Sequence, residues 1–361
     1  MSKKIAHLSS VHKDGDVRIF HKMCSSLAEN GYEVHLVLAG VQERVEKDVK
    51  IWSVEKAKGR LSRFWNTVNN VYDKAVEIDA DIYHIHDPEL LRIGKKLIKK
   101  GKKVIYDSHE DLPRQIMGKP YLKFRKIVSL WAEGYENRAT KKMTAIVGAT
   151  PHITNRFSKI NSNSVNINNY PILTEFNMEN SDTKRTDICY AGGITEIRGI
   201  HEIVSIADGS FPLVLAGPIG SGKLEEEITN HSNWKNIDYK GQVSRVEVKT
   251  IYSKSLAGLV ILHPIEAHKT AQPNKIFEYM NAGIAVIGSN FDLWKEIIED
   301  GSCGICVDPL KPEEIKNAIE QLLSDPKEAE KMGQNGQRLV KEKYNWDNEK
   351  EKLLKLYATL T

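Results

Sequence analysis

The sequence has few cysteines, little net charge and no long apolar run. Four cysteines among 361 residues suit a reducing compartment better than a disulfide scaffold. Lysine and arginine outnumber aspartate and glutamate by only 52 to 48, which does not indicate nucleic-acid binding. Apolar runs such as 256–262 have strand length, far below the roughly 20 residues of a spanning helix. These absences exclude disulfide-rich, nucleic-acid-binding and membrane-spanning proteins.

The N-terminal segment MSKKIAHLSSVHKDGD also lacks the apolar core of a secretory signal. We therefore expect a cytoplasmic protein. Cys303 and Cys306 form a C-x-x-C pair, but no second pair lies nearby to complete a zinc site. We expect no metal.

Strand-like and helical periods alternate from the first residues onward. In the first half the pattern predicts strands at 5–9, 33–38, 82–86 and 103–106, with helices at 19–29 and 88–100. Such alternation is typical of a parallel sheet with crossover helices. The length fits two domains of this kind.

The alternation stops and then restarts near the middle of the chain. Polar residues 161–187, with Pro171, fit neither helix nor strand apart from a short piece at 164–167. Afterwards the pattern predicts strands at 188–191, 213–216, 237–240, 258–261 and 285–288, and helices at 200–207, 274–281 and 347–357. We predict an α/β protein with two Rossmann-like domains and a cleft between them. Its parts are a first domain at 1–170, a linker at 171–187, a second domain at 188–343 and a closing helix at 344–361 that returns to the first domain.

Polar residues follow several of the predicted strands, where open α/β sheets bind ligands. In the first half they are residues 14–18, 86–88 and 107–111. His109 stands at the end of strand 103–106 and could donate to a sugar hydroxyl or move a proton. The alternative is a helix cap built from Asp107 and Ser108.

Glycines follow two strands of the second half. Gly192 and Gly193 come after strand 188–191, with Arg198 before the next helix, a combination suited to a phosphate. An exposed arginine beside a turn is the alternative. Gly217 opens a segment that looks like a P-loop, GPIGSGKL, but Leu224 replaces the magnesium-binding Ser or Thr. We interpret it as a glycine-rich turn near a ligand.

The segment HPIEAHKTAQPNKIFEYMNAGIAVIG, residues 263–288, gives the sharpest signal. Pro273 can begin a helix whose first turn contains Asn274 and Lys275. Free N–H groups, the helix dipole and the Lys275 charge together favour a diphosphate. Glu278, one turn further, could accept from the two hydroxyls of a ribose.

Four motifs in this order resemble the family 4 glycosyltransferases, which are retaining enzymes of the GT-B fold. The likeness covers nearly the whole chain and is closest to a subgroup common in bacterial surface-polysaccharide synthesis. The motifs are Asp16-Val17-Arg18-Ile19 with Gly31, Tyr106-Asp107-Ser108-His109-Glu110, Pro273-Asn274-Lys275-Ile276-Phe277-Glu278-Tyr279-Met280 with Gly283, and Tyr344-Asn345-Trp346.

The resemblance implies a metal-independent transfer from a nucleotide sugar, with UDP favoured over GDP, to a glycan or lipid-linked glycan. It implies that Glu278 holds the ribose, Arg198 and Lys275 the diphosphate, and His109 a hydroxyl of the transferred sugar. The catalytic residues would be His109, Arg198 and Lys275. The substrate-binding set would be Gly15, Asp16, Arg18, Gly192, Gly193, Gly217, Glu266, Thr270, Asn274 and Glu278, with no cofactor.

Two positions depart from the family pattern. Thr270 stands where a second glutamate is frequent, with Glu266 the nearest acid, and Gly193 stands where an arginine often follows the first glycine. Arg198 must therefore neutralise more of the charge that develops on the departing diphosphate. A double displacement would need a carboxylate nucleophile, for which Glu266 is the only candidate.

Two alternatives to a transferase stay open on the residues alone. A nucleotide-sugar epimerase on the same plan would need further acid–base residues. A non-catalytic partner subunit that only binds a sugar nucleotide is the second alternative, because Thr270 stands where the family often has a glutamate.

Basic and aromatic residues gather in the first half and predict a peripheral contact with an anionic membrane, at the inner face of the cell membrane. The alternative is a solvated helix end. The residues are Arg60, Arg63, Phe64, Trp65 and the lysines at 95, 96, 99, 100, 102 and 103.

Overall fold

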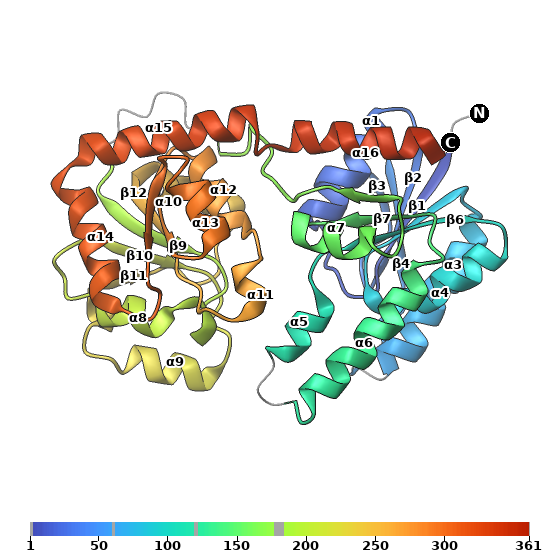
Figure 1. Ribbon diagram of the computed structural model, residues 1–361, viewed down its shortest axis with the longest axis horizontal. Coiled ribbons are helices and arrows are strands. Elements are labelled where there is room, and N and C mark those ends of the chain that lie inside the picture. Colours follow the sequence, from blue (N-terminus) through green and yellow to red (C-terminus); the bar gives the residue numbers. More distant parts are fainter. Residues whose placement is uncertain (1–2, 60–61, 119–121, 177–183, 361) are drawn as a thin grey trace. The chain divides into compact units, whose positions relative to one another are not determined.

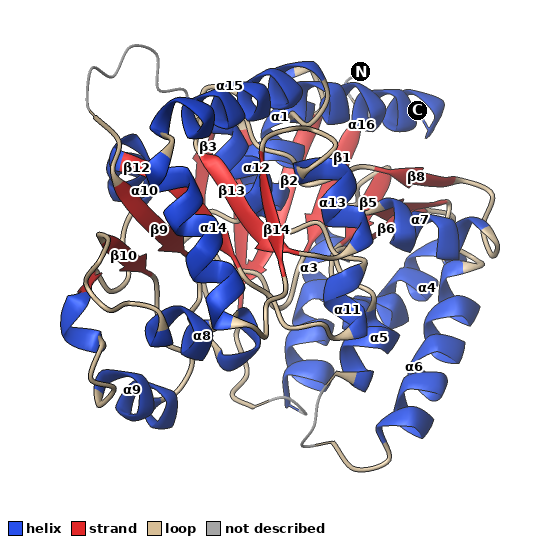
Figure 2. Cartoon of the chain, turned by 60° about the vertical axis from the view of Figure 1, so that its left-hand side comes forward, coloured by secondary structure: helices blue, strands red, loops and turns tan. Residues whose placement is uncertain are grey.

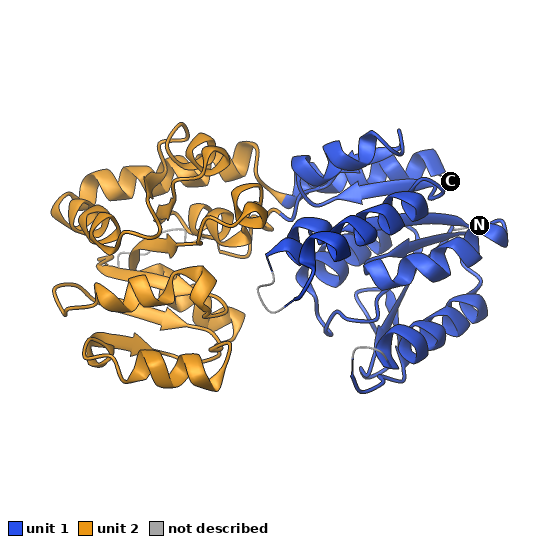
Figure 3. Cartoon of the chain, turned by 60° about the horizontal axis from the view of Figure 1, so that its bottom comes forward, with its two compact units in different colours: residues 1–169, 346–361 blue, residues 170–345 orange. Residues whose placement is uncertain are grey.

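The computed structural model describes residues 3–59, 62–118, 122–176 and 184–360 (Figure 1). The chain divides into two compact units (Figure 3). Unit 1 comprises Met1–Asn169 and Trp346–Thr361, and unit 2 comprises Tyr170–Asn345. The chain enters unit 2 once and returns to unit 1 for its last helix.

Unit 1 is built on an eight-stranded sheet in the order β3-β4-β2-β1-β5-β6-β7-β8. Neighbouring strands are parallel except for the antiparallel pair β3 and β4. The strands are β1 (Lys4–Leu8), β2 (Glu33–Ala39), β3 (Arg44–Glu46), β4 (Val49–Val54), β5 (Ile82–Ile85), β6 (Lys103–Ser108), β7 (Ala145–Gly148) and β8 (Ser164–Asn166).

Helices connect these strands. They are the π-helical η1 (Val17–Cys24) and η2 (Arg63–Thr67), the 3₁₀ turn η3 (Pro88–Leu90), α1 (Ser25–Glu29), α3 (Val68–Ile78), α4 (Leu91–Lys99), α5 (Leu112–Met117), α6 (Arg125–Thr140), α7 (Pro151–Ser158) and α16 (Trp346–Leu360). Helix α16 contacts η1 and β8. The indole of Trp346 donates to Ser26 Oγ at 3.0 Å, so the start of α16 is fixed to unit 1.

Unit 2 has a six-stranded, all-parallel sheet in the order β11-β10-β9-β12-β13-β14. Its strands are β9 (Asp187–Ala191), β10 (Leu213–Ala216), β11 (Ile237–Tyr239), β12 (Ser255–Val260), β13 (Ala285–Ser289) and β14 (Gly304–Val307). Its helical elements are η4 (Glu196–Arg198), α8 (Ile200–Ser205), α9 (Gly222–Thr229), η5 (Trp234–Asn236), α10 (Arg245–Lys254), α11 (Glu266–Lys269), α12 (Asn274–Asn281), α13 (Asp292–Ile298), α14 (Pro312–Ser324) and α15 (Pro326–Glu342).

The unit 2 sheet is buried on both faces, as its apolar strands require (Figure 2). Along β9, Ile188 and Tyr190 pack with α8 and α14, whereas Cys189 and Ala191 pack with α10 and α12. This alternation is the period of two expected for a strand. At Gly258 of β12 a Cβ would lie 2.5 Å from the Tyr279 ring, so only glycine allows α12 to pack this closely.

The predicted strands of both halves are confirmed, most with ends shifted by one or two residues and β12 beginning three residues early. The predicted helix at 19–29 begins at Val17 and has π-helical geometry in its first part. Helix 88–100 begins with the short η3. Within the predicted linker 171–187, Phe176 is fully buried in the core of unit 2, while residues 177–183 lie outside the described residues. None of the described helices combines the length and apolarity needed to cross a bilayer.

Candidate functional site

The turn after β9 brings together the residues of unit 2 expected to bind phosphate. The Tyr190 hydroxyl donates to Gly193 O at 2.6 Å, and Arg198 Nη1 donates to the same oxygen at 3.2 Å. A Cβ on Gly192 would lie 3.6 Å from Lys275 Cε and 3.8 Å from Arg198 Nη1. Two cationic side chains therefore flank a turn that has no side chain of its own, which suits an anionic ligand.

Gly217 follows the adjacent strand β10 and supports this turn. Its φ is +136°, and a Cβ there would lie 1.9 Å from Gly192 O. Gly192 N donates to Ala216 O at 2.8 Å, which ties the two turns together. The sequence similarity to a P-loop thus reflects close backbone packing at Gly217, and helix α9 begins only at Gly222, capped by Ser221.

Helix α12 begins after Pro273, as predicted, and places Lys275 and Glu278 on one face. Lys275 Nζ lies 2.6 Å from Glu278 Oε2, and the Tyr252 hydroxyl lies 3.3 Å from the same oxygen. Burial alone would raise the pKa of Glu278, but the charges of Lys275 and Arg245 outweigh it and lower the pKa to about 2. Glu278 is therefore an ionised, nearly buried acceptor.

Arg245 is a member of this group that the sequence did not reveal. Its Nη1 donates to Glu278 Oε1 at 3.2 Å, its Nε donates to Glu175 at 2.8 Å, and its guanidinium lies 4.7 Å from the centre of the Phe176 ring. The capping box of Ser244 and Glu247 could have indicated the start of α10. No local signal showed that Arg245 reaches α12, which begins 29 residues later.

The structure leaves three other predicted residues of unit 2 apart from this group. Glu266 is exposed and pairs with Lys269 at 2.7 Å. Thr270 ends α11, and Asn274 is exposed at the start of α12. Among the described residues, no recorded hydrogen bond joins any of the three to Arg198, Lys275 or Glu278.

In unit 1, the predicted His109 follows β6 and is held by Asp107. Its Nε2 lies 2.9 Å from Asp107 Oδ2, and its side chain is 19% exposed. Arg18 binds the same carboxylate through Nε at 3.0 Å and Nη2 at 2.7 Å. Burial raises the pKa of Asp107, but Arg18 and His109 lower it well below its ordinary value. Asp107 is thus a buried carboxylate with a permanent cation beside it.

A chain of buried hydrogen bonds continues from Asp107 to the last helix. His86 Nδ1 lies 3.2 Å from Asp107 Oδ2, His86 Nε2 lies 2.9 Å from His7 Nδ1, and the Tyr357 hydroxyl lies 3.3 Å from His7 Nε2 and 2.8 Å from His84 Nδ1. Burial lowers the pKa of His86 to about 4 and those of His7 and His84 well below the ordinary value, so all three are neutral.

These contacts leave one ring nitrogen of His109 open. Asp107 Oδ2 accepts from His109 Nε2, and His86 Nδ1 lies 3.2 Å from both that nitrogen and that oxygen. No described residue occupies His109 Nδ1, so this atom can form a hydrogen bond with a substrate hydroxyl.

The opening motif supports this arrangement. Arg18 is nearly buried and bonded to Asp107 and to Ile167 O, so the structure corrects its predicted contact with substrate to a role in holding Asp107. Asp16 caps η1 by accepting from Ile19 N at 2.9 Å. Gly15 precedes it with a φ of +70°.

A second aspartate–histidine pair, which the sequence did not single out as a pair, lies beside the first. His12 Nδ1 lies 3.0 Å from Oδ1 of the buried Asp87. The His12 and His109 rings have centroids 4.8 Å apart. Asp87 lies in the loop after β5 and Asp107 near the carboxyl end of β6, where ligand-binding residues were expected.

Two clusters in unit 1 contain enough histidine and carboxylate atoms to be considered as metal sites. In the first, the rings of His84 and His86 are stacked at 15°, so their in-plane lone pairs do not converge. In the second, the Arg18 guanidinium already occupies Asp107 beside His109, which disfavours a dication there. The Cys303 and Cys306 thiols belong to neither, and burial raises the pKa of each to about 12.

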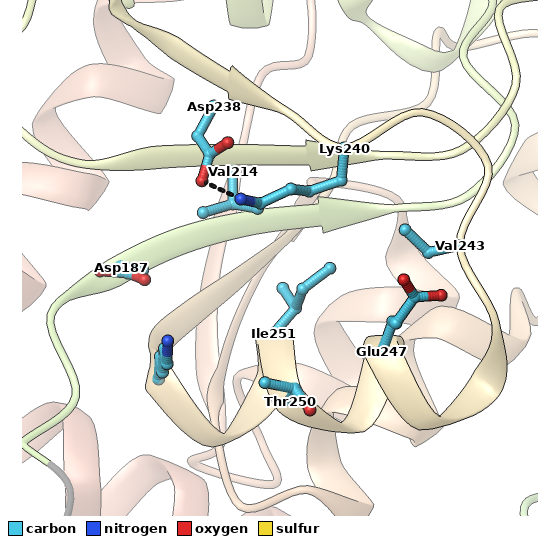
Figure 4. A pocket seen from close by; sticks show the side chains of 9 residues that line it. Asp187, Val214, Asp238, Lys240, Val243, Glu247, Thr250 and Ile251 are labelled. Atoms are coloured by element: carbon cyan, nitrogen blue, oxygen red, sulfur yellow. Dashed lines mark ion pairs between the residues drawn. The ribbon is translucent and has the colours of Figure 1, made fainter.

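A separate pocket of about 340 Å³ lies on unit 2 between β9, β11 and α10 (Figure 4). Asp238 and Lys240 form an ion pair at its edge at 2.8 Å. None of the predicted site residues lines it. We assign it no part in the site described above.

Two Rossmann-like α/β units with these turns define a GT-B glycosyltransferase. The family described as "Glycosyltransferase Family 4" matches residues 14–166, and "Glycosyl transferases group 1" matches residues 172–339. The chain belongs to the family 4 glycosyltransferases. It is an enzyme that transfers a sugar from a nucleotide-sugar donor to an acceptor.

Known relatives agree with this assignment. The chain is 22% identical over 328 residues to an uncharacterized glycosyltransferase of Methanocaldococcus jannaschii, covering 82% of this chain and 79% of that protein. It is also 22% identical over 285 residues to the alpha-D-kanosaminyltransferase of Streptomyces kanamyceticus, covering 68% of each.

Solved structures share the fold. Sucrose-phosphate synthase from Thermosynechococcus elongatus has a TM-score of 0.82 at 15% identity, covering 99% of each chain. Anabaena HepE, solved with UDP-glucose, has a TM-score of 0.74 at 12% identity, also covering 99% of each chain.

Proposed function

We propose that this glycosyltransferase uses a UDP-sugar, retains the anomeric configuration without a metal, and extends a glycan or lipid-linked glycan of the cell surface. The observation that carries this proposal is the meeting of Arg198 and Lys275 at the Gly192–Gly193 turn. Cations placed there would stabilise the negative charge that develops on the departing diphosphate. Anabaena HepE binds UDP and UDP-glucose, which favours UDP as the nucleotide.

Glu278 is proposed to hold the ribose. Its two oxygens now accept from Lys275, Tyr252 and Arg245. A bound nucleotide would draw Lys275 towards the phosphates and leave Glu278 Oε2 to accept from ribose hydroxyls. Arg245 would keep the carboxylate ionised during this exchange.

Calorimetric titration with UDP and GDP tests the donor site. We expect UDP to bind more tightly than GDP, and Glu278→Ala to weaken UDP binding at least tenfold because the ribose loses its acceptor. Glu328→Ala is the matched control, since it removes an exposed carboxylate of unit 2 that pairs with Lys331 and lies outside the predicted site. Unchanged UDP affinity in Glu278→Ala would contradict the ribose assignment.

Arg198→Lys tests the phosphate role. Lysine keeps the charge but lacks the bidentate fork, so turnover and UDP affinity are expected to fall together. Proton NMR of the first product formed would show its anomeric configuration, and inversion would contradict a retaining mechanism.

We also propose that the protein is cytoplasmic and that unit 1 contacts the anionic inner face of the cell membrane through helix α6. Of the residues first expected there, Arg63 pairs with Glu89 at 2.9 Å, Lys102 pairs with Asp79 at 2.7 Å, and Arg60 lies outside the described residues. Trp65 remains exposed but lies against the Arg92 guanidinium. This region offers few free groups to a bilayer.

Helix α6 offers an apolar face instead. Its exposed side chains are 66–77% accessible and recur at helical spacing, so they lie on one side: Phe124, Ile127, Leu130 and Trp131. The opposite side, including Ala132 and Ala139, is buried. An exposed apolar face of this kind marks an interaction surface.

Basic residues continue the same face. Lys95 Nζ lies 4.8 Å from the Tyr135 ring, which stacks with Trp131. Burial and the nearby charges of Lys142 and Arg138 lower the pKa of Lys95, so the three cations are neighbours. No ion pair among the described residues neutralises them. Apolar side chains beside uncompensated cations match an anionic bilayer, where each cation contributes about 1 kcal/mol.

Co-sedimentation with phosphatidylglycerol vesicles tests this surface. Wild type is expected to pellet at low salt and to be released at high salt. Leu130→Ser/Trp131→Ser is expected to stay in the supernatant. Val246→Ser, on an equally exposed side chain of unit 2, is the control and should pellet. Equal pelleting of all three proteins would refute the assignment to α6.

A further inference from the structure

The two aspartate–histidine pairs of unit 1 differ in the cation available to each carboxylate. Asp107 has Arg18 within 2.7 Å, so its negative charge is balanced without His109. Asp87 is equally buried, but among the described residues its only ion pair is with His12. Its other partners are neutral: Ser9 Oγ at 2.9 Å, Ser10 N at 2.6 Å and Ser10 Oγ at 3.1 Å.

A buried ionised carboxylate needs a counter-charge. Neutral donors hold Asp87 in its ionised form, and His12 is the group placed to balance it. His12 is therefore the imidazole placed to carry the compensating positive charge.

The charges facing His12 agree with a positively charged imidazole at this position. Burial opposes protonation, but the hydrogen bond and charge of Asp87 outweigh it, with Asp16 and Asp107 adding to the effect, and the pKa of His12 is raised. The opposing groups are two imidazoles, His86, which is neutral, and His109. The carboxyl of Asp87 in turn has its pKa lowered to about 2, against the effect of burial.

We propose that His12 is a further substrate-contacting residue. Its Nε2–H donates a hydrogen bond to an anionic oxygen of the ligand, next to the ligand hydroxyl that bonds to His109 Nδ1. Nδ1 of His12 is used by Asp87, and no described residue bonds to Nε2. The His12 side chain is 23% exposed, so this edge can be reached. The ligand chemistry is a phosphate or carboxylate group carried close to a hydroxyl. Assigning that group to the acceptor rests on the proposed function, whereas anion binding at His12 does not.

Histidine-selective ¹³C labelling tests both parts in the intact protein. The His12 and His109 Cε1 resonances are assigned with His12→Gln and His109→Gln, and both are titrated from pH 5 to 8. The His12 midpoint is expected to lie above that of an ordinary histidine, and Asp87→Asn should lower it. At pH 7, inorganic phosphate or sodium acetate should shift the His12 resonance. A response to phosphate alone or to acetate alone identifies the anion.

A control guards against loss of folding in Asp87→Asn. In wild type the anion should also shift the resonance of the neighbouring His109, and His12→Gln, which leaves the buried carboxylate and its serine partners in place, should abolish that shift. A His12 midpoint that Asp87→Asn leaves unchanged, or no His12 response to either anion, would overturn the proposal. UDP binding measured on the same sample reports on unit 2, so failure of the donor assignment is distinguishable from failure here.

Discussion

The contact between Asp107 and Arg18 allows a quantitative test of how His109 is held. The carboxylate is fully buried and accepts four hydrogen bonds, two from Arg18 and one each from His109 and His86. Asp107→Asn replaces one accepting oxygen by an NH₂ group that faces donors. Arg18, only 4% exposed, is then left without its counter-charge.

Removing one partner of a buried ion pair costs about 3–5 kcal/mol, because the other charge stays buried. We expect Asp107→Asn to lose stability in this range. The double variant Arg18→Met/Asp107→Asn removes both charges, so its cost should be smaller than the sum of the single costs by at least about 2 kcal/mol.

Native-state hydrogen exchange is the suitable assay, because it reports on β5 and β6 separately from unit 2. Additive costs in the double variant, or a loss below about 1 kcal/mol for Asp107→Asn, would refute a buried pair of this strength. The same variant tests the tautomer. If Asp107 acts through His109, Asp107→Asn should lower kcat in wild type but not in a His109→Ala background, whereas a purely structural defect would lower it in both.

Three shorter predictions follow from the geometry. Glu278→Gln should lower the free energy of unfolding by on the order of 3 kcal/mol at pH 7, because the pKa of Glu278 is lowered from 4.5 to about 2. This stabilisation is fully present above pH 4.5. In urea melts the difference between wild type and variant should therefore shrink as the pH falls below 4.5. Gly217→Ala should lower the free energy of unfolding by at least about 1 kcal/mol, because the new Cβ would overlap Gly192 O at a φ of +136°. An unchanged melting temperature would contradict this packing. Tyr357→Phe should lower the free energy of unfolding by about 1–3 kcal/mol, because the buried His7 and His84 both lose a hydrogen-bond partner. The loss should appear as faster hydrogen exchange in β1, which contains His7.

The strands and the helix starts could be predicted because their causes are local. Alternating burial along β9 and a proline before α12 are visible in a few consecutive residues. The π-helical geometry of η1 could not be foreseen, because the apolar pattern of residues 19–29 indicates a helix but not its type. The short hairpin of β3 and β4 was also missed, since the three residues of β3 give too little periodicity to detect.

The site was predicted in part, for a related reason. Family-like motifs located His109, Lys275 and Glu278, each in a loop or helix start where residue type and position are linked. They did not locate Arg245 or His12, because both act by pairing with a residue far along the chain: 33 positions separate Arg245 from Glu278. Such pairs leave no pattern in either segment.

Arg18 shows what a motif can and cannot establish. Its position in the opening motif predicted a substrate contact, yet its guanidinium is used by Asp107, 89 residues away. Both roles require arginine, so sequence alone cannot separate them. The difference matters for the chemistry, because Arg18 balances the charge of Asp107, while Asp87 has no arginine among the described residues and depends on His12. Two adjacent imidazoles thus stand beside buried carboxylates that differ in their counter-charge.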